Sequence, residues 1–406
     1  MKKYDISFWV AALALTFAPS SVLAHTVYVS PKGHDANRGT KAAPLSSVAA
    51  ARDALRAGGK LGKEPCAVIL EAGIYRLAEP LRFTPQDSGA EGAEVVYLAA
   101  EGADVTLTGA LSLKLNWKPW KDGIYQAKLE SEQTVDQLFI NGTRQVMARY
   151  PNAGAGKAVP FDGYSADAWD HTVRGWKNPV GAFFHGMHKS RWGGTHYQVT
   201  GLQDGKLITE GGWMENRAGT PHKEYRMAEN IFEELDAPGE WFYHLDKQTL
   251  YYVPENGTDL AAATAEAVFE VPHLIEIYGD TQLPMPTMKI TTLGNGMKEL
   301  IVETPVTTQP VQHIQFKGIH FTGTTRTFMQ TKEPLLRSDW TIYRGGAVHL
   351  RGTEQITIAE CRFDQLGGNA VFVDGYNRGT VIKGNRFEYN GASDVNFVGS
   401  PAAVRD

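Results

Sequence analysis

The stretch QITIAECRFDQLGGNAVFVDGYNRGTVIKGNRFEYNGASDVNFVG, residues 355–399, repeats itself after 24 residues. The equivalent pairs are Ile358 and Ile382, Cys361 and Asn385, Phe363 and Phe387, and Gly367 and Gly391. An earlier segment, HIQFKGIHFTGT at residues 313–324, begins the same pattern. A fixed period of this length is typical of a repeat architecture in which each copy forms one supersecondary unit.

Each copy contains three short strand-like runs separated by turns, as in residues 347–350, 355–359 and 362–364. A unit of this size cannot bury an apolar face alone, so the copies must stack on one another. The expected product is an all-β fold, a right-handed parallel β-helix whose successive coils lie about 4.8 Å apart.

The repeat also predicts which side chains point out of the coil, because side chains alternate between the two faces of a strand. The expected inward positions are Val348, Leu350, Val371, Val373, Val395 and Phe397. One outer face is expected to carry His349, Arg351, Phe372, Asp374, Asp394 and Asn396. Donors, carboxylates and an aromatic ring along an extended groove suit a polysaccharide. The residues assigned to substrate binding are His349, Arg351, Phe372 and Asn396, with a solvated sheet face as the alternative for each.

The outward carboxylates differ in their expected surroundings. Asp374 falls beside Arg351 of the neighbouring coil, where a charge-assisted contact would give it a structural role. Asp394 has no cationic neighbour in the alignment and is the stronger candidate for acid, base or nucleophile. The two lie one coil and four residues apart, about 14 Å, which is wider than the roughly 5–9.5 Å between the carboxyl groups of a glycosidase. Both are retained as catalytic candidates, and the partner of Asp394 is expected from a loop or a later coil.

Two further clusters could bind a metal ion. Asp364 and Glu388 are equivalent in the repeat, so they stack, and such a pair either raises one pKa or shares a cation such as Ca²⁺. The segment HGMHKSRWGGTHY brings together His185, His188 and His196, but no Cys or carboxylate completes a ligand spacing there. We therefore expect no metal site and no cofactor, with solvent exposure the simpler explanation of the Asp364 and Glu388 column.

The first 24 residues, MKKYDISFWVAALALTFAPSSVLA, combine two lysines, an apolar run and a small-residue ending. These are the features of an export signal cleaved near Ala24. No later stretch approaches the ~20 apolar residues of a membrane helix. The mature protein is expected to be secreted, periplasmic or attached to the cell surface.

The remaining chain divides into three parts. Residues 25–110 predict an N-terminal cap, with a helix that starts at Ser46 or Ser47, and the first coils. Residues 111–310 have longer polar loops, hairpin signals, most of the tryptophans and no 24-residue period, which indicates an inserted β-rich module. Residues 311–406 carry the repeat and end within a coil, so we expect a fragment that lacks its C-terminal coils.

Composition sets limits on the partners. The 406 residues are 42% hydrophobic and 21% charged, and the formal net charge is −5. This composition is typical of a folded globular protein. It offers no basic excess for nucleic acid or for an anionic membrane, whereas an acidic glycan stays open. The oligomeric state is not specified.

Several segments together resemble a known family. They are YVSPKGHDANRGTKAAP, AGIYRLAEPLRF, LFINGTRQVMARYPN, GEWFYHLDKQTLYYVP and HIQFKGIHF, followed by the repeat. The chain from about residue 26 onward is similar to the secreted β-helix carbohydrate-active proteins of glycoside hydrolase family 141, in the pectate-lyase-like superfamily. The resemblance implies a longer protein with more coils and catalytic aspartates on the groove face, to which Asp394 corresponds by its place in the coil.

Three functions are consistent with these features. The first is a secreted glycoside hydrolase that cleaves a plant or algal polysaccharide with a pair of carboxylates. The second is a polysaccharide lyase on the same scaffold, which needs a base near the uronate C5 and a cation or arginine for its carboxylate. The third is a glycan-binding protein without catalysis. The fold alone does not choose between them.

Overall fold

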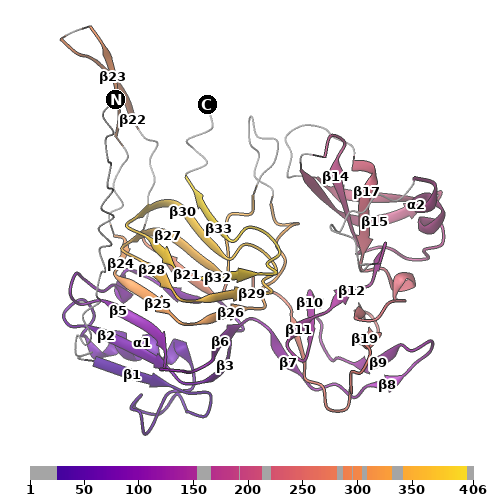
Figure 1. Cartoon of the computed structure of the whole chain (residues 1–406), viewed down its shortest axis with the longest axis horizontal. Coiled ribbons are helices and arrows are strands. Elements are labelled where there is room, and N and C mark those ends of the chain that lie inside the picture. The colour runs from indigo at the N-terminus through magenta and orange to yellow at the C-terminus, as the bar shows by residue number, and fades with distance from the viewer. Residues whose placement is uncertain are drawn as a thin grey trace, which may run out of the picture.

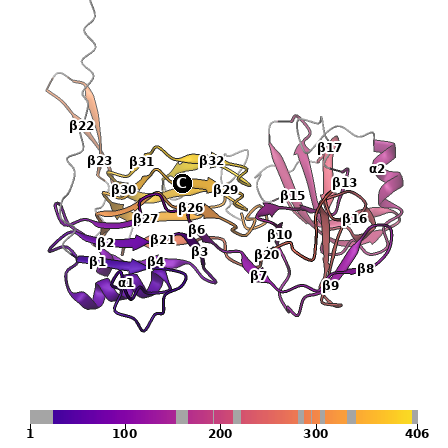
Figure 2. The ribbon, with the colours of Figure 1, turned by 60° about the horizontal axis from the view of Figure 1, so that its bottom comes forward.

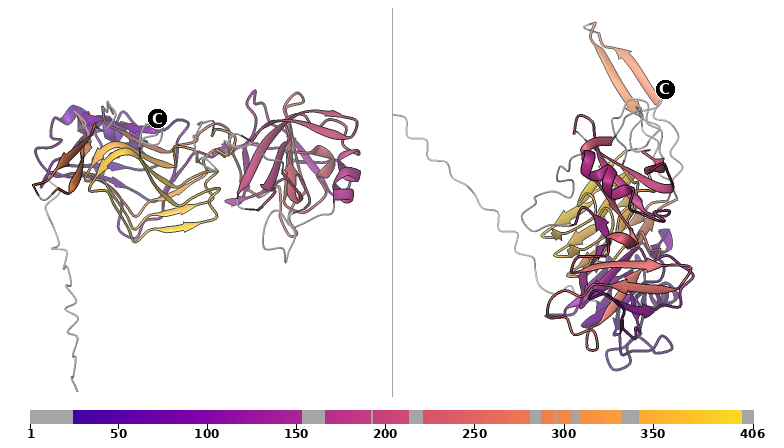
Figure 3. Two further views of the ribbon diagram at one scale, coloured as in Figure 1. Left: turned by 90° about the horizontal axis from the view of Figure 1, so that it is seen from above. Right: turned by 90° about the vertical axis from the view of Figure 1, so that its right-hand side faces the viewer.

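The computed structural model describes residues 25–152, 166–191, 193–212, 221–280, 287–294, 296–303, 309–331 and 342–399. The expected export signal, residues 1–24, and the last residues, 400–406, lie outside this description. The described chain is built mainly of β-strands, which form a coil domain and, beside it, a second body (Figure 1; Figure 3, left).

Three parallel sheets form the coil domain (Figure 2). Sheet one contains β1 (His25–Val29), β2 (Cys66–Leu70), β5 (Val95–Ala99), β25 (Ile314–Lys317), β28 (Thr357–Ala359) and β31 (Val381–Lys383). Sheet two contains β3 (Gly73–Arg76), β6 (Val105–Thr108), β26 (His320–Thr322), β29 (Arg362–Asp364) and β32 (Arg386–Glu388). Sheet three contains β4 (Leu81–Phe83), β21 (Ile275–Tyr278), β27 (Val348–Glu354), β30 (Val371–Arg378) and β33 (Val395–Val398), and β24 (Val311–Gln312) also pairs with β27.

The chain visits the three sheets in turn, so each coil contributes one strand to each. The successive coils are β2-β3-β4, β5-β6-β21, β25-β26-β27, β28-β29-β30 and β31-β32-β33. This is the arrangement expected of a parallel β-helix. The 24-residue register is confirmed, since Phe363 pairs with Phe387 and Ile358 with Ile382.

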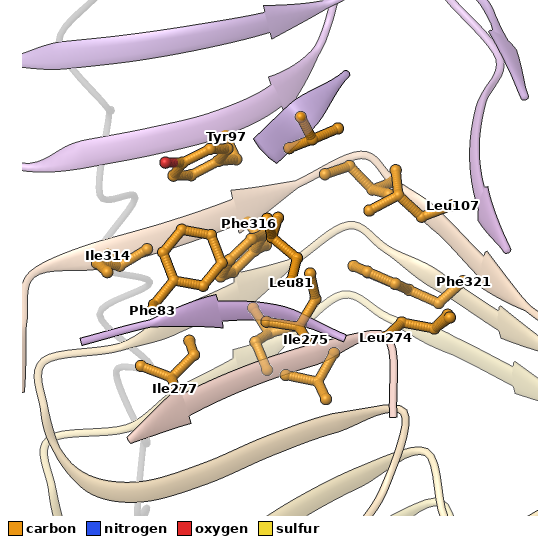
Figure 4. Packing of buried hydrophobic residues seen from close by; sticks show 14 of the residues in the cluster. Leu81, Phe83, Tyr97, Leu107, Leu274, Ile275, Ile277, Ile314, Phe316 and Phe321 are labelled. Carbon is orange, nitrogen blue, oxygen red and sulfur yellow. The ribbon is translucent and has the colours of Figure 1, made fainter. Parts of the chain in front are cut away.

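The inward positions fill a continuous apolar core. Phe321, Phe363 and Phe387 stack with ring centroids 4.9 and 5.0 Å apart. Nearer the first coils, Phe83 and Phe316 contact Tyr97 with centroids 5.2 and 5.4 Å away (Figure 4). Tyr97 and Phe316, like the three phenylalanines, lie one above another because equivalent residues of successive coils are paired in register, whereas Phe83 meets them edge to face from sheet three.

The predicted inward positions of β27 and β30 are confirmed, and the burial expected on β33 is not. Val348, Leu350, Val371 and Val373 are all buried. Val395 and Phe397 keep the register but are 36% and 66% exposed. Within the described ranges, β33 is the edge strand of sheet three and pairs with β30 alone. No further coil there covers the side chains of Val395 and Phe397.

Helix α1 (Val48–Gly58) lies against the first strands of the coil domain (Figure 1). It begins after Ser47, whose hydroxyl accepts a hydrogen bond from the backbone N–H of Ala50, as an N-cap should. Its apolar face, Val48, Ala51 and Leu55, joins the core. The 3-10 turn η1 (Pro85–Asp87) follows β4, and its Asp87 pairs with Arg56 of the helix.

The second body is inserted into one coil, between β6 and β21. Its first two sheets contain β7 (Leu111–Leu113), β8 (Lys118–Pro119), β9 (Tyr125–Lys128), β10 (Gln137–Ile140), β11 (Thr143–Arg144), β12 (Val146–Met147), β18 (Glu240–His244), β19 (Thr249–Tyr252) and β20 (Ala265–Val268). Its third sheet contains β13 (Arg149–Tyr150), β14 (Phe183–His188), β15 (Gly194–Gln203), β16 (Lys206–Gly211) and β17 (Pro221–Glu229). Helix α2 (Ala166–Val173) and the turn η2 (Phe232–Glu234) complete it.

The end of the insert differs from the sequence-based boundary. Strand β21 lies within residues 111–310, the range predicted as inserted, yet it pairs in parallel with β4 and β27 of sheet three. A single strand that completes a coil after a long insert carries no repeat of its own, so periodicity does not reveal it. A hairpin, β22 (Thr287–Thr292) and β23 (Lys298–Glu303), follows β21 and projects on the side of the coil domain, away from the insert (Figure 1). No helix in the described parts of the chain is both long enough and apolar enough to span a bilayer.

The recurring glycine of the repeat marks a point where successive turns touch. A Cβ added at Gly367 would overlap the carbonyl oxygen of Thr324, and one at Gly391 would overlap the carbonyl oxygen of Gly367. We expect Gly367→Ala to lower the free energy of unfolding by about 1–3 kcal/mol, because backbone must shift to admit the methyl group. Gly193→Ala, where a Cβ meets nothing within 4 Å, is the matched control in urea unfolding. Equal stability of the two variants would contradict this account.

Candidate functional site

The outer face of sheet three carries two columns of polar and aromatic side chains across the coils. Cα pairing aligns Arg82, Glu276, His349, Phe372 and Asn396 in the first column. It aligns Tyr278, Arg351, Asp374 and Val398 in the second. The columns arise because each of these residues alternates with an inward apolar residue of its strand.

One group of contacts links Tyr278, His349 and Asp374. The hydroxyl of Tyr278 lies 2.8 Å from Nδ1 of His349. On the other side of the ring, Nε2 of His349 lies 3.6 Å from Oδ2 of Asp374, too far for a hydrogen bond. This nitrogen is buried and has no hydrogen-bond partner. Asp374 also forms an ion pair with Arg344, from the segment that precedes β27.

A second group repeats the same chemistry beside the first. The hydroxyl of Tyr343 lies 2.9 Å from Nε2 of His273, and Nδ1 of His273 lies 2.8 Å from Oε1 of Glu276. Glu276 also accepts a hydrogen bond of 2.7 Å from Nε of Arg82. The rings of His273 and His349 meet edge to face with centroids 5.1 Å apart. The outer face therefore holds two Tyr–His–carboxylate groups in contact, and we call them the paired relays.

The relays keep their carboxyl groups ionised and one imidazole neutral. Burial raises the pKa of Asp374, but His349 and Arg344 outweigh it and hold that pKa below its ordinary value. Burial likewise raises the pKa of Glu276, and His273 and Arg82 bring it below the ordinary value. Burial lowers the pKa of His349 and raises the pKa of Tyr343 to about 12. At neutral pH the relays thus present two anionic carboxylates beside neutral hydroxyl groups.

Three of the residues predicted from sequence lie at this site and are buried: His349 and Asp374 belong to the relays, and Phe372 is next to them in the first column. His349 is 5%, Phe372 0% and Asp374 7% exposed. Asp374 is paired in register with Arg351, as the alignment requires, but its ion-pair partner is Arg344. Arg344 lies in the connection between β26 and β27, which is longer than its counterpart in the next coil, so the 24-residue period gives no sign of this contact.

The other predicted residues lie further along the same face. Asp394 is exposed and accepts a hydrogen bond of 3.0 Å from Asn390. Because Val395 pairs with Val371, the residue next to Asp394 in the preceding coil is Ala370. Asp374 lies four residues further along that coil, so Asp374 and Asp394 are about 14 Å apart. Arg351 is exposed, and Nδ2 of Asn396 is buried without a hydrogen-bond partner.

The stacked carboxylates Asp364 and Glu388 are paired in register, and basic side chains surround them. Arg362 pairs with both, Arg386 pairs with Glu388, and His320 Nε2 lies 3.7 Å from Asp364. This compensation leaves little attraction for Ca²⁺. In the described part of the chain, no group of three or more His, Cys, Asp or Glu side chains is placed to hold a metal ion.

The relay residues that sequence reasoning missed come from two segments. Glu276 and Tyr278 alternate with Ile275 and Ile277, and that alternation is a strand signal inside the range taken for the insert. Tyr343 and Arg344 reach the site from the connection between β26 and β27 of one coil, where position in the chain gives no indication of position in space. His273 precedes β21 by two residues and carries no motif of its own.

Comparisons with known proteins give a structural likeness only. No protein-family model and no curated protein matches the chain. A solved structure described as a glycoside hydrolase superposes with a TM-score of 0.66 at 20% identity, covering 89% of this chain and 65% of its own. XylC with xylose matches at a TM-score of 0.43 and 12% identity, over 87% of this chain and 42% of its own. The Gp54 tailspike of Acinetobacter baumannii bacteriophage AP22, with capsular saccharide, gives 0.13 at 6%, over 86% and 44%.

These comparisons establish a fold like that of a glycoside hydrolase for most of the described chain. The chain spans 65% of the length of that protein. At 20% identity the likeness concerns the fold alone, so the evidence for any reaction must come from the site itself.

The lowered carboxyl pKa values make the stability of the relays dependent on pH. A carboxyl group with a folded-state pKa below its unfolded value stabilises the fold above the unfolded pKa, near 4, and that contribution is lost as pH falls further. We expect Asp374→Asn to be less stable than the parent protein at pH 7, with the deficit shrinking at about pH 3. Urea unfolding at both pH values measures this. Asp394→Asn, at an exposed position, is the control and should change stability by less than about 0.5 kcal/mol. A deficit for Asp374→Asn that is the same at both pH values would exclude the linkage.

Proposed function

We propose that this chain is part of a secreted glycoside hydrolase with a right-handed parallel β-helix. It cleaves a glycosidic bond of a plant or algal polysaccharide on the outer face of sheet three. The observation that carries the proposal is the unpartnered, buried Nε2 of His349 facing the ionised Asp374. A buried polar atom without a partner is rare and costly, and such atoms occur at functional sites.

The tautomer of His349 follows from its neighbours. Burial raises the pKa of Tyr278, so its hydroxyl keeps its proton and donates to Nδ1 of His349. The neutral imidazole then carries its proton on Nε2, the side that faces Asp374. This N–H has no partner within the protein, so a sugar hydroxyl that uncovers the site on binding would find a donor there, and the carboxylate beside it can accept from the same sugar.

Asp374 and Glu276 are the two carboxylates that we propose for the reaction. Their Cα atoms lie two coils and two residues apart, about 12 Å, so side chains that lean together bring the carboxyl groups toward the ~6.5–9.5 Å of an inverting pair. Asp374, held ionised by Arg344, is the general base that activates the water. Glu276 is the acid, which requires that a bound sugar displace the exposed Arg82 from it, because loss of that cation raises the pKa of Glu276.

The other predicted residues belong to the sugar-binding surface in this proposal. Arg351 and Asn396 flank the relays, and Nδ2 of Asn396 has a free donor. Asp394 lies about 14 Å from Asp374 and contacts a neighbouring sugar unit rather than the scissile bond. The likeness in fold to a glycoside hydrolase supports the reaction class by analogy.

A lyase is the second candidate, because exposed guanidinium groups lie next to the Tyr–His pairs. The side chain of Arg82 is 69% exposed, and Arg351 is exposed on the same face. Either could neutralise a uronate carboxylate while the ionised Asp374 removes the proton at C5. The product decides: hydrolysis gives a new reducing end alone, whereas elimination gives an unsaturated sugar that absorbs in the ultraviolet. Binding without either product would favour a glycan-binding protein.

The assignment of the carboxylates is tested by three matched amide variants. We expect Asp374→Asn and Glu276→Gln each to lower kcat on the order of 10²–10⁴-fold, because each removes a group that acts in the transition state. Asp394→Asn should change kcat by only a few fold and mainly raise KM. Reducing-end release from plant and algal polysaccharides is the assay. Loss of activity in Asp394→Asn with full activity in the other two would move the chemistry to Asp394.

A further inference from the structure

A cavity of about 630 Å³ lies between two sheets of the insert and the coil domain. We call the parts of the insert built on these two sheets its two lobes. One wall comes from the sheet of β12 and β18, another from the sheet of β14 and β15, and the floor from Thr325 and Arg326 after β26. Its volume is within the ~300–1,000 Å³ typical of small-molecule sites. None of the paired relay residues lines it.

The floor of the cavity is an ion-pair network in which one arginine pairs with two carboxylates. Nε of Arg326 lies 3.0 Å from Oδ1 of Asp136, and its backbone N–H donates to Oδ2 of Asp136 at 2.7 Å. The same guanidinium group pairs with Glu229, which lies 3.2 Å from Nε2 of His185. His196, the last histidine of the HGMHKSRWGGTHY segment, contacts His185, and their Nδ1 atoms are 2.7 Å apart. These nitrogens are therefore engaged with each other and with Glu229.

Aromatic rings form the walls above this floor. Phe183 lies beside the guanidinium group of Arg326, 5.3 Å from the ring centroid. Phe232 and Phe242 lie on the opposite lobe with centroids 5.2 Å apart, and both are only partly buried. Asn178 and Gln198 add amide groups to the lining. Flat apolar faces next to carboxylate and amide groups are the surroundings that sugar rings, with their apolar C–H faces and hydroxyl edges, require.

The charges around the cavity disfavour an anionic ligand. Asp136, Glu233 and Asp246 line it against Arg326 and Lys247, and Glu229 adds a further negative charge behind the floor. Because Arg326 is already paired with two carboxylates, it has no charge left to offer a uronate. The remaining acceptor capacity of Asp136 suits hydroxyl donors.

We propose that this cavity binds one neutral sugar unit, separately from the reaction on sheet three. The proposal rests on the cavity, its aromatic walls and its ion-paired floor. It does not depend on whether the paired relays hydrolyse, eliminate or only bind.

The test measures binding of neutral and charged sugars to the full chain and to two tryptophan variants. The probes are D-glucose, D-galactose and D-xylose, with D-glucuronate as the charged counterpart. Binding of each is measured by saturation-transfer NMR and titration calorimetry. Val180 lines the cavity and is 58% exposed, so Val180→Trp fills the space without disturbing the core. Ile208 of β16 is 47% exposed in the same lobe and does not line the cavity, so Ile208→Trp is the matched control.

We expect at least one neutral sugar to bind with a Kd of about 1–10 mM, and glucuronate to bind at least tenfold more weakly. Val180→Trp should weaken the neutral sugar about tenfold or more, and Ile208→Trp should leave it unchanged. Asp374→Asn should also bind normally, which separates this site from the proposed catalytic one. Absence of neutral-sugar binding, equal binding in Val180→Trp, or equal losses in both tryptophan variants would overturn the proposal.

Discussion

Parallel backbone pairing between successive coils is the constraint on which the rest of this structure depends. Pairing of Val348 with Val371, and of Val371 with Val395, fixes which side chains meet across the coils. A slip by one residue would turn every inward side chain outward. The register therefore determines the stacked rings of the core, the close approach at Gly367 and the order of polar residues on the outer face together.

The site combines this regular framework with irregular connections. Glu276 and His349 occupy paired positions of neighbouring strands, so the framework alone brings them together. Tyr343 and Arg344 arrive from the connection before β27, and His273 from the end of the insert. Each histidine thus receives its position or its partners from a connection between strands. A repeat scaffold can acquire a specific site in this way, because the coils supply rigidity while the connections supply chemistry.

The sequence predicts the regular part of this arrangement well and the irregular part poorly. The 24-residue period was sufficient for the pairing of Phe363 with Phe387 and for the outward position of Asp374. The period also predicts Arg351 as the neighbour of Asp374, and the backbone pairing confirms this. The side chain of Asp374, however, forms its ion pair with Arg344. Side-chain partners depend on connections that follow no period. For the same reason β21 was assigned to the insert, and Glu276 was missed with it.

The insert joins the coil domain through two strands that lie side by side. Strand β7, where the insert begins, pairs with β20, where it ends, and Leu111 lies opposite Ala267. An unfolded loop of this length would impose an entropic cost on closing the coil between β6 and β21. A folded insert with adjacent ends removes that cost, because it holds the two connections at a fixed short separation. Topologically the insert is thus equivalent to a tight turn, and a short loop could take its place without breaking the path of the coil.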